Sequence, residues 1–161
     1  MSTFDEAITA VYQGDYRALS SYFSDCDPSA TDGDGRTLLM HAVLASDASP
    51  QMVEFLLDHG VPVDAVDRDQ GWSALHFAAR DKRSEIVDVL VQRGARVDLV
   101  ECYGNTPLAR SLDYLPYDAS TIAILINAGA DPSHKNHYGQ SPVDVARLMQ
   151  DAGLERILLR K

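Results

Sequence analysis

Four aspartates lie close together between residues 25 and 34, and clustered carboxylates are the ligands that calcium prefers. A calcium loop of the EF-hand type also needs oxygen ligands at alternate positions, a central glycine and a final glutamate. Counted from Asp25, Ala30 occupies the glycine position and Arg36 occupies the glutamate position. The pattern therefore argues against a calcium site.

Two histidines, His134 and His137, are three residues apart and could contact one metal ion. No third ligand accompanies them, so a structural or incidental role is favoured over a metal centre. The sequence also lacks a glycine-rich phosphate loop, a CxxC pair and a recognisable nucleophile elbow. We therefore predict no catalytic residues, no metal and no cofactor, and a function other than catalysis.

The acidic excess is confined to the first half of the chain. Residues 1–69 contain 13 acidic and 3 basic residues, whereas residues 70–161 contain 11 of each. Such a field repels nucleic acid and anionic membranes and attracts a protein with a basic surface. Some of these carboxylates, such as Glu54 and Asp58, fit an ordinary solvated face; Asp34 and Asp69 stand apart, because they occupy turn positions without an evident folding role.

Two series of glycines recur with one period and divide the chain into similar units. Gly35, Gly71, Gly104 and Gly139 each precede a Ser or Thr by two residues, at spacings of 36, 33 and 35. A second series follows the apolar runs FLLDHG, VLVQRG and ILINAG at spacings of 34 and 35. Interleaved series of one period indicate a repeat protein.

Each unit predicts two short helices followed by an extended segment. Thr106-Pro107 and Ser141-Pro142 combine an N-cap hydroxyl with a proline at the first helical position. In the central copy, Ser84 is predicted to cap the second helix and Gly94 to end it. In that copy the first helix is expected to bury Leu75, Ala78 and Ala79. The second helix is expected to have a wide apolar face made of Ile86, Val87, Val89, Leu90 and Val91.

The segments GWSALHFAA (71–79), GNTPLA (104–109) and GADPSHKN (129–136) resemble the ankyrin repeat, and the resemblance covers nearly the whole chain. It implies an all-α solenoid of helix-turn-helix units joined by short β-turn fingers, forming a single domain over 1–161. The expected boundaries are an N-terminal capping repeat at 1–31, full repeats at 32–66, 67–100 and 101–135, and a C-terminal capping repeat at 136–161. His76 takes the position of the family histidine that hydrogen-bonds the finger backbone.

The third repeat contains a long inter-helix segment, RSLDYLPYDAS. Pro116 disfavours helix at Leu115. Two tyrosines and a leucine are more apolar than an exposed loop requires. The segment from Tyr114 to Tyr117 is therefore either a lid on the core or a contact surface, and the sequence does not decide between them.

The resemblance also implies that residues beside the finger glycines and at the ends of the first helices form a concave partner-binding surface. Trp72, Tyr103 and Tyr138 are expected in a row of exposed aromatic side chains, the alternative being that Trp72 folds back over the first helix and serves stability. The predicted binding residues are Asp34, Arg36, Arg68, Asp69, Trp72, Arg80, Asp81, Tyr103, Asn105, Asp113, Tyr114, Tyr138 and Gln140.

The amino-acid sequences of the motifs resemble those of short stand-alone bacterial ankyrin proteins that serve as immunity factors for toxins. This implies a protein that binds and blocks a partner; the alternative is a stand-alone regulator or adaptor of a kinase, transcription factor or enzyme. MSTFDEAITAV lacks the pattern of a targeting segment, and no run approaches the roughly 20 apolar residues that span a bilayer. We expect a cytoplasmic protein that is monomeric when unbound.

Overall fold

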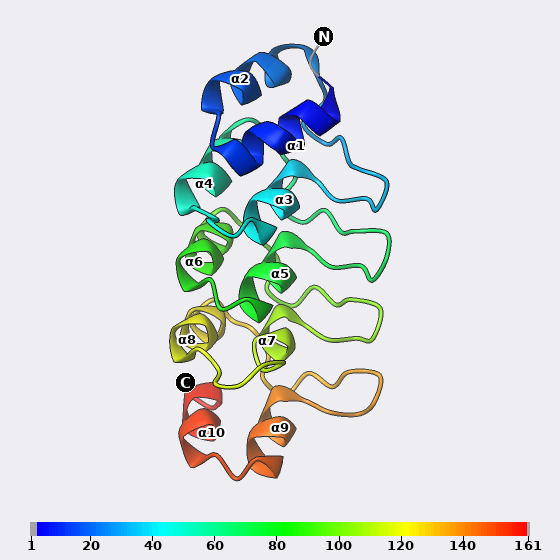
Figure 1. Ribbon diagram of the computed structural model, residues 1–161. Coiled ribbons are helices and arrows are strands. Elements are labelled where there is room, and N and C mark those ends of the chain that lie inside the picture. Colours follow the sequence, from blue (N-terminus) through cyan, green and yellow to red (C-terminus); the bar gives the residue numbers. More distant parts are fainter. Residues whose placement is uncertain (1–2, 161) are drawn as a thin grey trace.

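Residues 3–160, which the computed structural model describes, form ten short helices that pair into five stacked units (Figure 1). The inner row contains α1 (Phe4–Gln13), α3 (Leu38–Leu44), α5 (Ala74–Arg80), α7 (Pro107–Arg110) and α9 (Pro142–Leu148). The outer row contains α2 (Tyr16–Asp25), α4 (Pro50–Asp58), α6 (Ser84–Gln92), α8 (Ala119–Asn127) and α10 (Ala152–Leu158). The predicted all-α solenoid is confirmed.

Side-chain caps explain where most of these helices begin. Nine of the ten have a Ser, Thr or Asp whose side chain accepts the backbone N–H three residues later. The exception is α6, so the predicted capping role of Ser84 is wrong: Ser84 is the first helical residue, and Arg83 occupies the cap without a side-chain hydrogen bond. The chain turns into α6 through Lys82, whose φ is 58°, which brings Arg83 to the cap.

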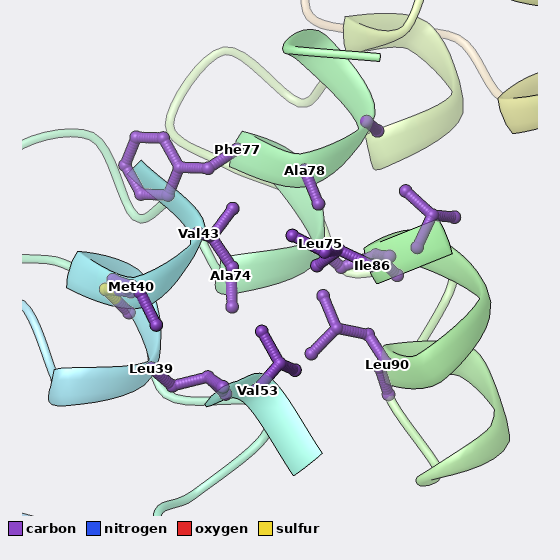
Figure 2. Packing of buried hydrophobic residues seen from close by; sticks show 14 of the residues in the cluster. Leu39, Met40, Val43, Val53, Ala74, Leu75, Phe77, Ala78, Ile86 and Leu90 are labelled. Atoms are coloured by element: carbon purple, nitrogen blue, oxygen red, sulfur yellow. The ribbon is translucent and has the colours of Figure 1, made fainter. Parts of the chain in front are cut away.

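The core runs between the two rows, where each unit covers the apolar face of the next. Figure 2 shows side chains from four consecutive helices meeting there, among them Val43 of α3, Val53 of α4, Leu75 of α5 and Leu90 of α6. Small residues such as Ala78 let the inner helices approach closely, as expected from the sequence. Because every unit relies on its neighbours for burial, stability is shared along the stack.

Four extended fingers project from the inner row (Figure 1); they comprise residues 32–36, 67–72, 101–105 and 136–140 and are numbered fingers 1 to 4. The first residue of each finger is a clamp, because its side chain accepts two backbone N–H groups of the same finger. The acceptor oxygens lie 2.8–3.2 Å from the amide nitrogens. The four clamp residues are Asp32, Asp67, Glu101 and Asn136.

Backbone hydrogen bonds also join each finger to the next. The N–H groups of Arg68, Cys102 and His137, each directly after a clamp residue, donate to carbonyls of the preceding finger at 2.8, 2.8 and 2.9 Å. The fingers approach so closely that a Cβ at Gly35 would lie 2.6 Å from Cγ of Arg68. Gly35 also has a φ of +80°, so glycine is required there for conformation and for space.

His76 ties α5 to finger 3 through both ring nitrogens. Its Nδ1 accepts from the Ser73 backbone N–H and hydroxyl (3.2 and 2.9 Å), so its Nε2 carries the proton and donates to the Asn105 carbonyl at 3.2 Å. The predicted hydrogen bond to the finger backbone is confirmed. Burial lowers the pKa of His76 from its ordinary value to about 4, because a charged imidazole would lose its hydration.

The inner row is interrupted at α7, which is a single turn of four residues, whereas α3, α5 and α9 each have seven. Within residues 3–160, neighbouring inner helices pack closely from α1 to α7, but α7 and α9 touch much less. The chain leaves the inner row after Arg110 and crosses to α8 through the segment 111–118. A hollow therefore remains between α7 and α9.

Removing residues 136–161 should abolish cooperative unfolding of the remaining chain or lower its midpoint strongly. The deletion uncovers α8, which packs against α10, and no polar cap replaces the lost unit. Thermal unfolding followed by circular dichroism provides the measurement. A truncated chain that melts like the intact one would contradict the account of stacking.

The stability of the fold should fall between pH 6.5 and pH 4 because of His76. The folded state holds this imidazole neutral, whereas the unfolded chain takes up the proton near pH 6.5, so the stabilisation is complete above pH 6.5 and is lost as the pH falls toward 4. Between pH 7.5 and pH 5.0 the loss is about 2 kcal/mol in the free energy of unfolding. For His76→Gln, the free energy of unfolding measured by urea denaturation should change less between these two pH values, by about that amount. An equal change for the variant and the original protein would contradict this role of His76.

Candidate protein-binding surface

The fingers and the inner helices carry all but three of the thirteen predicted binding residues; Asp81, Asp113 and Tyr114 lie just beyond the ends of α5 and α7. Most of the set is accessible to a partner. The exposed members are Asp34, Arg68, Asp69, Tyr103, Asp113, Tyr114, Tyr138 and Gln140. The half-buried members are Arg36, Arg80, Asp81 and Asn105, and Trp72 is buried.

Tyr103 and Tyr138 form a stacked pair on adjacent finger tips. Their ring centroids are 6.4 Å apart with an interplanar angle of 23°, and the side chains are 43% and 72% exposed. Both residues directly precede a finger glycine, so the backbone ladder places them in register. Two large rings in this position contribute little to the core and present a broad aromatic surface to solvent.

Trp72 does not continue this row, so the prediction of three exposed aromatic residues is wrong for it. The side chain is only 5% exposed and folds back onto α5, 5.0 Å from the Phe77 ring between centroids. The reason is register: Trp72 follows the finger glycine, whereas Tyr103 and Tyr138 precede it. The backbone N–H of Trp72 donates to Oδ1 of the clamp residue Asp67 at 2.9 Å, which places the Trp72 side chain at the base of finger 2.

Two guanidinium groups lie over the indole ring of Trp72. The Cζ atoms of Arg80 and Arg110 are 5.0 and 4.8 Å from the ring centroid, within the range of cation–π attraction. Arg80 is also paired with Asp81, with Nε to Oδ1 at 2.7 Å. The predicted residues Trp72, Arg80 and Asp81 are therefore brought together, but in a compact structural cluster.

Arg110 and Glu101 complete this cluster and were not identified from the sequence. Nη2 of Arg110 lies 3.2 Å from Oε2 of Glu101, whose side chain is fully buried. Burial alone would raise the pKa of Glu101, but hydrogen bonds from Asn105 and Tyr103, together with the charge of Arg110, bring its pKa below the usual value. One signal was available: Arg110 lies six residues after the finger glycine, a position taken by Phe77 in the preceding repeat.

The segment between α7 and α8 divides into an exposed part and an anchored part. Tyr114 and Leu115 are 61% and 63% exposed, so they do not cover the core. Tyr117 is half-buried, and its hydroxyl donates to Oδ2 of Asp151 at 3.1 Å, which fastens the segment to the start of α10. Of the two alternatives left by the sequence, the lid applies to Tyr117, while Tyr114 and Leu115 are available for contact.

Two other features, a metal site and a membrane-spanning helix, are absent from residues 3–160. No group of three or more His, Cys, Asp or Glu side chains is arranged to hold a metal ion there. Nε2 of His134 instead lies 3.0 Å from the Gly104 carbonyl oxygen, a contact between neighbouring units. Over the same residues, every helix is too short or too polar to cross a bilayer.

Residues 7–101 match the family model that describes ankyrin repeats in three copies. The chain is 31% identical to NF-kappa-B inhibitor zeta of Bos taurus over 86% of its own length and 23% of that protein. It is 32% identical to protein arginine N-methyltransferase 2 of Cryptococcus neoformans, over 83% of the chain and 38% of the relative. It is also 26% identical to an ankyrin repeat-containing protein of Treponema pallidum, over 94% of the chain and 50% of the relative. The chain thus spans about a quarter to a half of the lengths of these relatives.

Trp72→Ala should destabilise the fold, whereas Tyr103→Ala should leave stability nearly unchanged. The first substitution removes a buried ring against which two guanidinium groups pack and opens a cavity, at a cost of about 3–5 kcal/mol. The second removes an exposed ring, which typically changes stability by no more than about 0.5 kcal/mol. Urea denaturation of both variants provides the comparison, and equal effects would contradict the assignment of Trp72 to the fold.

Proposed function

Because the chain belongs to the ankyrin-repeat family of protein-binding modules, we propose that it binds one partner protein on its finger face and blocks that partner's activity. The specific role we propose is that of an immunity protein which neutralises a bacterial toxin. The chain acts by covering the partner's surface and carries out no chemical reaction itself. It needs no cofactor, and it is monomeric until it binds.

The exposed Tyr103–Tyr138 pair is the observation that carries this proposal. Tyrosine is among the residues that most often dominate protein interfaces, because its ring buries a large area with little loss of conformational freedom. The cluster around Trp72 holds the base of the fingers rigidly, so the tips need little reordering on binding. Tyr114 and Leu115 extend the exposed apolar surface beyond the fingers.

The charge of the chain supports a partner with a basic surface. The formal net charge is −10, and exposed carboxylates such as Asp34 and Asp69 lie on the fingers themselves. Opposite charge accelerates association and disfavours anionic competitors. If the toxin acts on nucleic acid, its substrate-binding surface is itself basic and offers the complementary field.

The relatives differ in what they contribute to this proposal. The ankyrin repeat-containing protein of Treponema pallidum is a bacterial relative, and its name gives no partner. NF-kappa-B inhibitor zeta, named as an inhibitor of another protein, favours the second candidate, a regulator that binds a signalling or transcription protein. The two are separated by co-expressing the chain with the products of adjacent genes: rescue of growth from a toxic product supports immunity, whereas a stable complex with a non-toxic regulatory protein supports regulation.

Tyr103→Ala and Tyr138→Ala should each weaken binding of the cognate partner by about 2 kcal/mol, or about thirtyfold in Kd, because each removes an exposed interface ring. Leu159→Ala is the matched control, since Leu159 is 51% exposed but lies at the end of α10, in the outer row of helices. Surface plasmon resonance against the partner obtained by co-expression provides the measurement. Unchanged affinity for both tyrosine variants would overturn the assignment of the finger face.

A further inference from the structure

A groove of about 250 Å³ lies between α7 and α9, where the inner row is interrupted. It exists because α7 ends after one turn, so the side chains that would fill this space in a full-length inner helix are missing. This feature is specific to the third repeat: α3 and α5 continue for seven residues. The residues that matter for its chemistry are Asn105, Leu112, Asp113, Tyr138, Gln140 and Val145.

The groove combines an apolar lining with a polar and aromatic rim. Leu112 and Val145 are half-buried and supply apolar surface. Gln140, which is exposed, and the ring of Tyr138 come from finger 4. A small apolar side chain could lie against the lining while polar groups of the same ligand reach the rim.

The charges at the groove leave one carboxylate uncompensated. Arg110 pairs with two carboxylates: Glu101 at 3.2 Å and Asp113, with Nη1 to Oδ2 at 3.1 Å. The nearby Arg80 is paired with Asp81 and also acts on Asp113 through its charge. This group of five ionised side chains therefore carries a net charge of −1 and favours a cation.

We propose that this groove binds an extended segment of the partner protein that carries an arginine or lysine next to a small apolar side chain. The apolar side chain contacts Leu112 and Val145, and the cation reaches Asp113 and the ring of Tyr138. This inference rests on the proposed function, because it supplies the chemistry of the segment that the finger face holds.

The test uses random twelve-residue peptides displayed on phage and selected on the immobilised full-length chain. We expect enriched peptides to contain Arg or Lys beside Ala, Val, Leu or Pro. Synthetic copies should bind the chain in fluorescence polarisation, and Asp113→Asn should raise their Kd at least about tenfold through loss of the charge pair. Tyr138→Ala should raise the Kd as well. Asp47→Asn, an exposed carboxylate between α3 and α4, and Leu159→Ala should change it less than about twofold.

The proposal would be overturned if acidic or uncharged peptides were enriched, or if no peptide were enriched. It would also be overturned if Asp113→Asn left the Kd of the enriched peptides unchanged. Melting temperatures of the variants establish that they fold. The cognate partner separates this inference from the proposed function. A partner that loses affinity with Tyr103→Ala but is indifferent to Asp113→Asn refutes the groove and leaves the function standing, whereas indifference to both substitutions refutes both.

Discussion

The finger face depends on one hydrogen-bond constraint: each finger is closed by its clamp side chain. A carboxylate or amide oxygen takes up two N–H groups that would otherwise point into a tight turn without partners, and an unpaired amide of this kind is costly. Closure fixes the finger backbone, and a fixed backbone allows the ladder from one finger to the next. Because the clamp and the ladder use only backbone groups of the tip residues, their side chains are free to serve binding.

The same constraint accounts for part of the acidic charge. Asp32 and Asp67 are clamps, Asp15 caps α2, and Asp64 accepts the N–H of Arg96 at 2.9 Å. Burial works against ionisation of Asp32, yet its hydrogen bonds hold its pKa below the ordinary value, so it stays charged for structural reasons. The net charge of the first half therefore overstates the charge available to a partner. The exposed carboxylates on the finger tips, such as Asp34, supply the negative charge that a partner protein can contact.

The fold could be predicted from the sequence because each unit needs the same local features. These are glycines at the turns, Ser or Thr at the helix starts, and apolar runs on the buried helix faces. The positions of the aromatic side chains on the fingers were predicted only in part. Tyr103 and Tyr138 were placed correctly, since their position before a glycine fixes them on the tips. Trp72 was misplaced because it follows the finger glycine instead of preceding it, and because a tryptophan's preference for burial competes with its position near a turn. The pairing of Arg110 with Glu101 joins two elements through side-chain reach, which no local pattern encodes.

The shortened α7 links these features. One turn of helix packs closely against α5 but offers little surface to α9. Glu101 is the one clamp that is a glutamate, and its longer side chain closes finger 3 while also reaching Arg110. Arg110 in turn lies over Trp72 of finger 2. A chain of charged and cation–π contacts thus joins fingers 2 and 3 to the end of α7. The same contacts hold Arg110, and with it Asp113, at one edge of the groove, so the open site borders a fixed framework.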